Sequence, residues 1–221
     1  MSRRDFTAAA GLAALPLLSG CGSSLAPSRY RFRMTVEVAT PQGLKTGSSV
    51  MEVSATRQIL ATSETHPISA GLRGESVVVD LPSGPLFALL TIRGFGGPLL
   101  LNVVTDALNP LNARSPNTDD YMRQTDELAA MAEGARQAIL QRDNWPEMVR
   151  FGDLAVPRSL EVVDPEAAGV KQVSVAVTHA PLTFEIEKRL GWLNKMDRFR
   201  FNGKTAFSDL YPTESKFLRS L

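Results

Sequence analysis

The sequence predicts an α+β fold that is rich in strands, with a mostly antiparallel meander sheet and helices set apart from it. Three observations carry this prediction. Residues 29–38 alternate strictly between polar and apolar side chains, which is the pattern of a half-buried strand. Turn-forming prolines and glycines divide the first half of the chain into short apolar runs. A helical spacing of apolar residues extends over one longer segment, residues 119–141.

The first half of the chain is expected to form a run of strands. These strands are expected at residues 29–38, 49–57, 75–81, 86–92 and 99–104. In the first of them, one face carries the apolar side chains Tyr30, Phe32, Met34, Val36 and Val38. Pro82-Ser83-Gly84-Pro85 separates two of the runs and predicts a hairpin. Residues 59–73 contain Pro67 and Gly71 and are expected to form a loop.

The second half mixes helices and strands. The longer helix, residues 119–141, begins with Asp119 and Asp120, whose charges suit a helix N-terminus, although Gly134 weakens its middle. Extended pieces are expected at residues 148–151, 157–165 and 170–178. After Pro181, Thr183 is expected to cap a short C-terminal helix at residues 184–193.

The N-terminus has the parts of an export signal in order. A basic start, Ser2-Arg3-Arg4-Asp5-Phe6, precedes an apolar run at residues 7–18. This run is shorter than the roughly 20 residues that span a bilayer, and it contains glycine and proline. The run closes at Leu18-Ser19-Gly20-Cys21. An export signal is therefore expected here, and a transmembrane helix is not.

These residues resemble two known motifs. Arg3, Arg4 and Phe6 resemble the recognition residues of twin-arginine signal peptides, with Thr7 and Ala8 in place of the pattern's Leu-Lys; the general secretory route is the alternative. Leu18, Ser19, Gly20 and Cys21 resemble a bacterial lipobox. The resemblance implies that the Cys21 thiol forms a thioether to a diacylglyceryl group, that the peptide before it is removed, and that the new amino group is acylated.

The resemblance divides the chain and implies a location. Residues 1–20 are expected to be the cleaved signal peptide, 21–28 a lipidated tether, and 29–221 a single globular domain. Two or more acyl chains anchor a protein stably, so the membrane is the expected partner. The domain is expected to face the periplasm from the bacterial envelope. In lipoproteins of bacteria with two membranes, an aspartate just after the acylated cysteine favours retention in the inner membrane. Gly22 and Ser23 occupy these positions here, so the outer membrane is favoured over the inner one.

Composition limits the chemistry of the mature part. The chain has 24 basic and 23 acidic residues, so no strong field draws in nucleic acid, and no nucleic-acid partner is expected. One cysteine and two histidines leave no ligand set for a metal, and no cofactor is expected. His66 is expected in an exposed loop and His179 at a strand end, half in the core. The glycine-rich residues 93–98 fit a hairpin loop better than a phosphate loop.

Arginines and aromatic residues alternate at residues 29–33 and 198–201. In a strand this alternation places the two types on opposite faces, so Arg29, Arg31 and Arg33 are expected to form one row facing water. Because this row follows Cys21 closely, contact with lipid headgroups or with a protein partner is the alternative.

No residue is assigned a catalytic role, and the leading hypothesis is a non-catalytic binding or structural lipoprotein whose envelope partner is not identified. The first alternative is an envelope hydrolase with an acid-based site, which predicts convergent carboxylates in a deep pocket. The second is an immunity or inhibitor lipoprotein, which predicts an exposed apolar patch or protruding loop.

Overall fold

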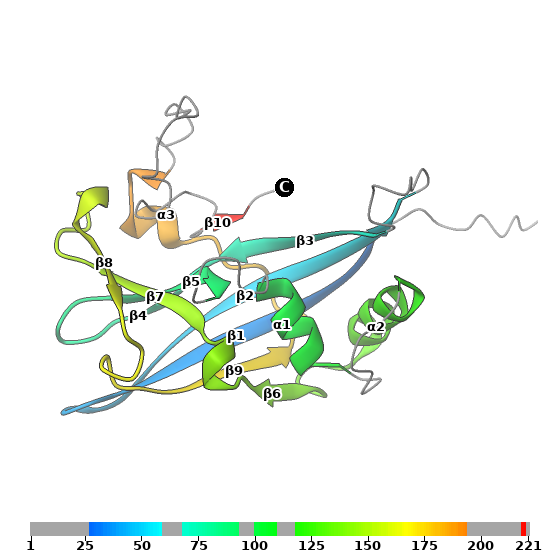
Figure 1. Cartoon of the computed structure of the whole chain (residues 1–221), viewed down its shortest axis with the longest axis horizontal. Helices are drawn as coiled ribbons and strands as arrows, with labels where there is room; N and C mark the ends of the chain where they lie inside the picture. Colours follow the sequence, from blue (N-terminus) through cyan, green and yellow to red (C-terminus); the bar gives the residue numbers. More distant parts are fainter. Residues whose placement is uncertain (1–26, 59–67, 93–99, 110–117, 194–217, 220–221) are drawn as a thin grey trace, which may run out of the picture.

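The computed structural model describes residues 27–58, 68–92, 100–109, 118–193 and 218–219, which form two antiparallel sheets with short helices around them (Figure 1). The strand-rich α+β class predicted from the sequence is confirmed. The six-stranded sheet has the order β10-β3-β2-β1-β9-β6, with bounds β10 Leu218–Arg219, β3 Ile68–Glu75, β2 Gly43–Arg57, β1 Ser28–Thr40, β9 Val170–Val177 and β6 Gln137–Ile139. The four-stranded sheet has the order β4-β5-β7-β8, with bounds β4 Val77–Val79, β5 Leu86–Ile92, β7 Pro146–Phe151 and β8 Leu160–Val163.

The hairpin of β1 and β2 is the longest feature of the fold. Its pairing runs without a shift from Ser28 opposite Ala55 to Thr40 opposite Gly43. The turn is stabilised by the Thr40 hydroxyl, which donates to the Gly43 carbonyl at 2.7 Å and accepts the Gln42 N–H at 3.2 Å. The alternation seen in the sequence is confirmed, because Tyr30, Phe32, Met34, Val36 and Val38 are buried and the side chains between them are exposed or partly exposed.

The main core lies on the inner face of the long hairpin. Near the middle and far end of β1 it is covered by the four-stranded sheet, through the inward side chains of β4, β5 and β7 such as Val79, Ala88 and Met148. The first crossing between the sheets takes one residue, Ser76, which separates β3 from β4. There the backbones approach closely: a Cβ added at Gly47 would stand 2.0 Å from the Val78 carbonyl oxygen.

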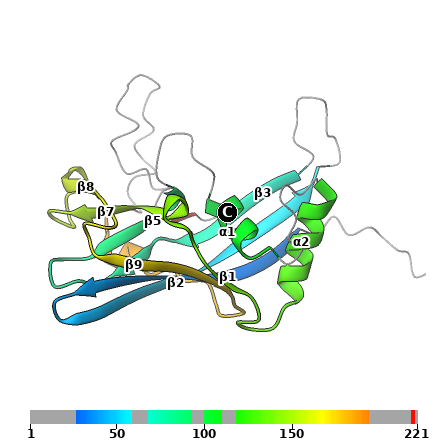
Figure 2. The same cartoon turned by 60° about the horizontal axis from the view of Figure 1, so that its bottom comes forward.

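Two helices cover the inner face near the start of β1. They are α1, Leu100–Ala107, and α2, Thr118–Ala130, and Figure 2 shows α2 beside the N-terminal part of β1. The Thr105 hydroxyl donates its one proton to the Leu101 carbonyl. It therefore accepts the hydrogen bond from the buried Tyr30 hydroxyl, at 2.8 Å. Gln124 of α2 donates to the Thr105 carbonyl at 2.8 Å. This buried polar contact joins β1, α1 and α2, and burial raises the pKa of the Tyr30 hydroxyl.

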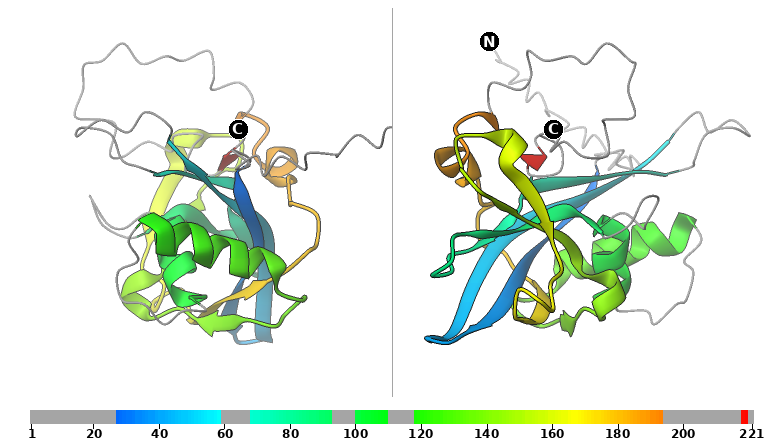
Figure 3. Two further views of the ribbon diagram at one scale, coloured as in Figure 1. Left: turned by 90° about the vertical axis from the view of Figure 1, so that its right-hand side faces the viewer. Right: turned by 60° about the vertical axis from the view of Figure 1, so that its left-hand side comes forward.

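A second, smaller core lies on the opposite face of the four-stranded sheet. Side chains of β5 and β7 on this face pack against the segment around α3, Ile186–Arg189, which is coloured orange in Figure 3. Its fully buried members are Phe87, Leu89, Val149, Ile186, Leu190 and Leu193. Phe151 stands edge-on to both Phe87 and Trp192, and the Trp192 indole donates to the Leu154 carbonyl at 2.9 Å. The four-stranded sheet is therefore apolar on both faces, which explains the nearly continuous apolar run of β5.

An exposed ion pair links α3 to the end of β4. Arg189 donates to both carboxylate oxygens of Asp80, at 2.5 and 2.8 Å, and these bonds hold the pKa of Asp80 below its ordinary value. Because both side chains are exposed, Asp80→Asn should lower the free energy of unfolding at pH 7 by less than about 1 kcal/mol.

The same ion pair has a defined pH dependence. A carboxyl whose pKa is lowered on folding stabilises the protein above its ordinary pKa, and this contribution disappears as the pH falls through the lowered value. Urea unfolding of the wild type and of Asp80→Asn should therefore give curves that converge below pH 4. A difference in stability that stays constant down to pH 2 would contradict this role of Arg189.

Two expected elements differ from the observed ones. The helix expected at residues 119–141 ends at Ala130, because Gly134 adopts φ +69° and the following residues pair with the free edge of β9 instead. The Gly134 and Leu140 N–H groups donate to the Val177 and Val173 carbonyls. The strand expected at residues 99–104 is α1, in which Leu100, Leu101, Val103 and Val104 are buried while Asn102 and Asp106 are exposed, the spacing of a helix with one buried face.

Other boundaries also differ from expectation. Residues 68–73, expected in a loop, belong to β3, while 59–67 lie outside the described residues. The strand expected at residues 75–81 is limited to β4 because the chain changes sheets at Ser76, and its hairpin with β5 is confirmed. The C-terminal helix expected at residues 184–193 is the single turn α3. Thr183 does not cap it, because its hydroxyl accepts the Val50 N–H at 2.9 Å.

Candidate functional site

Three turns meet at the end of the molecule that is farthest from the start of β1, at the left in Figure 1. They are the β1–β2 turn, the β4–β5 turn, and the turn at residues 164–169 that precedes β9. A hollow of about 400 Å³ lies between them, which is within the size range of small-molecule sites. Its lining residues are Ala39, Thr40, Pro41, Gln42, Leu81, Pro82, Ser83, Arg150 and Ala168.

Arg150 is the ionisable side chain of this lining. On β7, Val149 and Phe151 face the second core, whereas Met148 faces the main core. Because side chains two apart share a face of a strand, Arg150 points to the same side as Met148, between the two sheets. Its Nε is buried and has no hydrogen-bond acceptor among the described residues. A cation is thus held at the open end of the space between the sheets.

The surroundings of Arg150 include one carboxylate on a neighbouring strand. Glu161 of β8 stands directly opposite Arg150 in the β7–β8 register. The Glu161 side chain is exposed, and within the described residues it forms no ion pair with Arg150. The guanidinium of Arg150 therefore keeps N–H groups for another acceptor.

The rest of the lining is small, apolar and neutral. The Thr40 hydroxyl is held by its two bonds in the turn, and Gln42 and Ser83 add an exposed amide and an exposed hydroxyl at the rim. The remaining wall consists of alanine, proline and leucine side chains. A single cation in such a wall can bind an anion, and the apolar wall can cover an apolar part of the same ligand.

The wall formed by residues 164–169 is built before any ligand arrives. The Asp164 carboxylate accepts the N–H groups of Glu166 and Ala167, at 2.9 and 3.0 Å. The Gly169 carbonyl accepts the Ala39 N–H at 2.9 Å, and a Cβ on Gly169 would come within 2.7 Å of the Ala39 oxygen. The turn is therefore pressed against β1 at the hollow.

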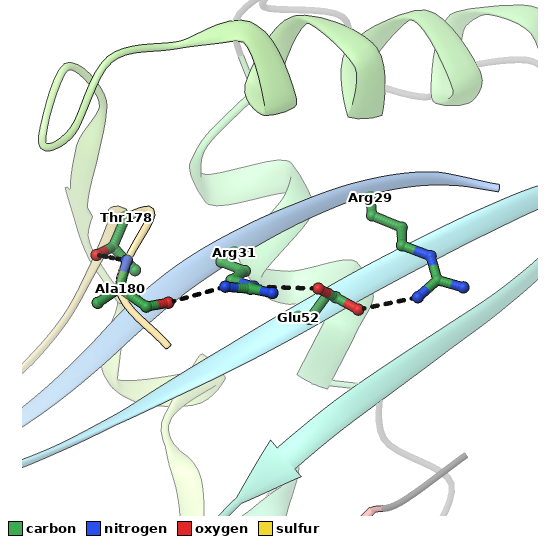
Figure 4. Close-up of polar contacts among 5 residues, drawn as sticks. All are labelled: Arg29, Arg31, Glu52, Thr178 and Ala180. Atoms are coloured by element: carbon green, nitrogen blue, oxygen red, sulfur yellow. Dashed lines mark hydrogen bonds and ion pairs between the residues drawn. The ribbon is translucent and has the colours of Figure 1, made fainter. Parts of the chain in front are cut away.

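Two arginines of the row on β1 bind a buried carboxylate. The buried Glu52 carboxylate accepts Arg31 Nε at 3.1 Å and Arg29 Nη1 at 3.4 Å (Figure 4). Arg31 also donates to the Ala180 carbonyl at 3.2 Å, and the Ala180 N–H donates to the Thr178 hydroxyl at 3.2 Å. The row is partly solvated, as expected, but two of its arginines bind Glu52 and one of them secures the segment after β9 to the sheet.

Glu133 holds the same segment from the other side. Its carboxylate accepts the Thr178 hydroxyl at 2.6 Å and the His179 N–H, and the Thr178 bond is the main cause of its lowered pKa. The His179 side chain is exposed, so the expectation that it lies half in the core was wrong. It leaves the strand pattern because the strand ends at Val177.

Most site residues predicted from the sequence fall outside the described residues. These are the signal residues Arg3, Arg4 and Phe6, the lipobox residues Leu18, Ser19, Gly20 and Cys21, the loop residue His66, and the segments 93–98 and 198–201. Sequence reasoning missed Arg150. The one signal for it was a charged residue two positions after Met148, on the apolar side of a predicted strand.

The described residues contain no group of three or more His, Cys, Asp or Glu side chains placed to bind a metal ion. Within the same residues, no helix is both long enough and apolar enough to cross a membrane. No protein-family model matches the chain, and neither a curated protein sequence nor a solved structure resembles it significantly.

Proposed function

We propose that the chain is an exported lipoprotein, anchored to the bacterial envelope through Cys21 and working there as a non-catalytic binding module. The observation that carries the proposal is the motif Leu18-Ser19-Gly20-Cys21, in which the only cysteine of the chain follows a short apolar run and an arginine pair. Such a run is too short to span a bilayer, whereas acylation of Cys21 would anchor the mature chain stably.

The distance between the anchor and the folded part supports this role. Ser28 begins β1, so the link from Cys21 spans at most about 25 Å when fully extended. The thirteen residues of β1 then lead about 40 Å away from that link to the turn at Pro41 and Gln42. The hollow lined by Arg150 lies beside this turn, so a lipid-anchored chain can hold it away from the bilayer.

The proposed location is the periplasmic side of the envelope. Gly22 and Ser23 follow the acylated cysteine, and the absence of aspartate there favours the outer membrane over the inner one. The twin-arginine pair, Arg3 and Arg4, supports export through the twin-arginine route.

The anchor is tested with Cys21→Ala in the native host, with Ser23→Ala as a matched control in the tether. We expect the wild type and Ser23→Ala in the membrane fraction, with intact masses of a chain that begins at an acylated Cys21. Cys21→Ala removes the acylated sulfur, so it should be unprocessed or leave the membrane fraction. A wild-type mass that includes Met1, or a free Cys21 thiol in the mature chain, would overturn the proposal.

A further inference from the structure

We propose that the hollow at the β1–β2 turn binds a small organic monocarboxylate, whose carboxylate pairs with the guanidinium of Arg150 while its apolar part lies against the surrounding wall. This inference deepens the binding role proposed above. It does not depend on the lipid anchor, because every residue that carries it belongs to β1, β7 and the turns beside them.

The position of Arg150 is the first argument. A buried donor without an acceptor costs free energy, and a cation drawn toward a core costs more unless an anion meets it. Arg150 shares its side of β7 with Met148, which is fully buried, and its Nε has no acceptor among the described residues. The Nε atom is too deeply buried for a ligand to reach, but the two terminal N–H groups of the same planar guanidinium can donate parallel hydrogen bonds to the two oxygens of a carboxylate in the hollow.

The charge of the lining is the second argument. Of the described residues that line the hollow, Arg150 is the one that is charged, and no carboxylate stands among them to repel an anion. One cation matches one negative charge, whereas a doubly charged phosphate would keep an uncompensated charge against apolar walls. Binding a monocarboxylate is therefore favoured over binding phosphate.

The wall is the third argument, because it defines the rest of the ligand. Ala39, Leu81 and Ala168 present apolar groups, and the prolines of two turns complete that surface. Ser83 and Gln42 at the rim supply a hydroxyl and an amide to a second polar group of the ligand. The ligand class is thus a compact aliphatic or aromatic acid.

Preorganisation is the fourth argument. The Thr40 bonds fix one turn, and the Asp164 and Gly169 bonds fix the turn on the other side of the hollow. A ligand that enters a rigid hollow orders few protein groups, so little affinity is lost to conformational entropy.

Benzoate is a suitable probe for this site. We would titrate it into the ¹⁵N-labelled full chain in a mild detergent at constant ionic strength and follow the backbone amides and the Arg150 Nε–H by NMR. Saturable shifts are expected at Thr40, Gln42, Ser83 and Ala168, with a Kd on the order of 1–10 mM. Benzyl alcohol, the neutral analogue, should bind at least about tenfold more weakly, because it cannot pair with the guanidinium.

Substitutions test whether the positive charge that binds benzoate is that of Arg150. Arg150→Gln should weaken benzoate binding at least about tenfold, whereas Arg158→Gln, an exposed arginine outside the lining, should leave it unchanged. If Arg150→Gln does not fold, Ser83→Trp at the exposed β4–β5 turn provides a steric test, since the indole should obstruct the hollow. Benzoate binding unaffected by either variant would overturn the site.

The same titration distinguishes a carboxylate ligand from a phosphate ligand. If inorganic phosphate gives saturable shifts at these residues and benzoate does not, the assignment of a carboxylate ligand is wrong. If neither anion gives saturable shifts, the hollow is not an anion site. Because Cys21→Ala tests the anchor separately, failure of the anchor and failure of the site give different results.

Discussion

Gly47→Ala is expected to lower the free energy of unfolding by about 1–3 kcal/mol, or to prevent folding. A Cβ at this position would stand 2.0 Å from the Val78 carbonyl oxygen, 2.7 Å from its carbonyl carbon and 3.1 Å from the Val79 Cα. All three atoms belong to the backbone, so no side-chain rotation relieves the clash. The two strands would have to separate where β2 and β4 approach and the two sheets share the main core.

Urea unfolding at pH 7 measures this effect, and Gly191→Ala is the matched control. A Cβ at Gly191 meets nothing within 4 Å, and this glycine does not have a positive φ. Gly191→Ala should therefore change the free energy of unfolding by less than about 0.5 kcal/mol. Equal effects of the two substitutions would mean that β2 and β4 do not approach as closely as described.

Glu75→Ala is expected to cost about 2–3 kcal/mol of unfolding free energy. The Glu75 side chain is 4% exposed, and its Oε2 accepts the N–H groups of Glu185 and Ile186 at 2.5 and 2.7 Å. These two N–H groups begin the turn of α3, and alanine would leave them without this acceptor. Because α3 carries Ile186 into the second core, loosening it also exposes apolar surface there.

Glu75→Gln separates the hydrogen bonds from the charge. The amide oxygen of glutamine can accept the same two N–H groups, so this substitution should cost less than about 1 kcal/mol at pH 7. Burial raises the pKa of Glu75 above its ordinary value, so the wild type gains stability as the pH falls through the raised value. The free energy of unfolding of the wild type, relative to that of Glu75→Gln, should therefore increase from pH 7 to pH 4.

Chemical unfolding of both Glu75 variants at pH 7 and pH 4 provides the measurement. Equal losses for Glu75→Ala and Glu75→Gln would show that Glu75 does not act as an acceptor for the start of α3. A stability difference between the wild type and Glu75→Gln that shifts in favour of the glutamine variant at pH 4 would contradict the raised pKa.

Local patterns predicted those elements whose two faces differ. β1 alternates because one face meets the main core and the other meets solvent and Glu52, and β9 alternates for the same reason. The β4–β5 hairpin was predicted by its turn residues, Pro82-Ser83-Gly84-Pro85, which favour a chain reversal whatever surrounds them. In these elements the information is local, so the sequence sufficed.

Local patterns failed where the deciding contact came from a distant part of the chain. Thr183 has the residue type of a helix cap, yet its hydroxyl accepts the Val50 N–H instead. The acceptor for the N–H groups at the start of α3 is Glu75, more than 100 residues away in the chain. Gly134 turns the chain out of α2 because β9 offers unpaired backbone groups on its free edge. No spacing rule within either segment contains this information.

The sequence by itself determined the strand-rich α+β class and the faces of the longest strands, and it alone carries the prediction of a lipid anchor at Cys21. Tertiary structure decided that β3 and β6 join the sheet and that Arg150 lines a hollow. The physical reason is that periodicity records only which side of an element is buried. The identity of the group that buries it, or that satisfies its backbone, depends on residues far away in the chain.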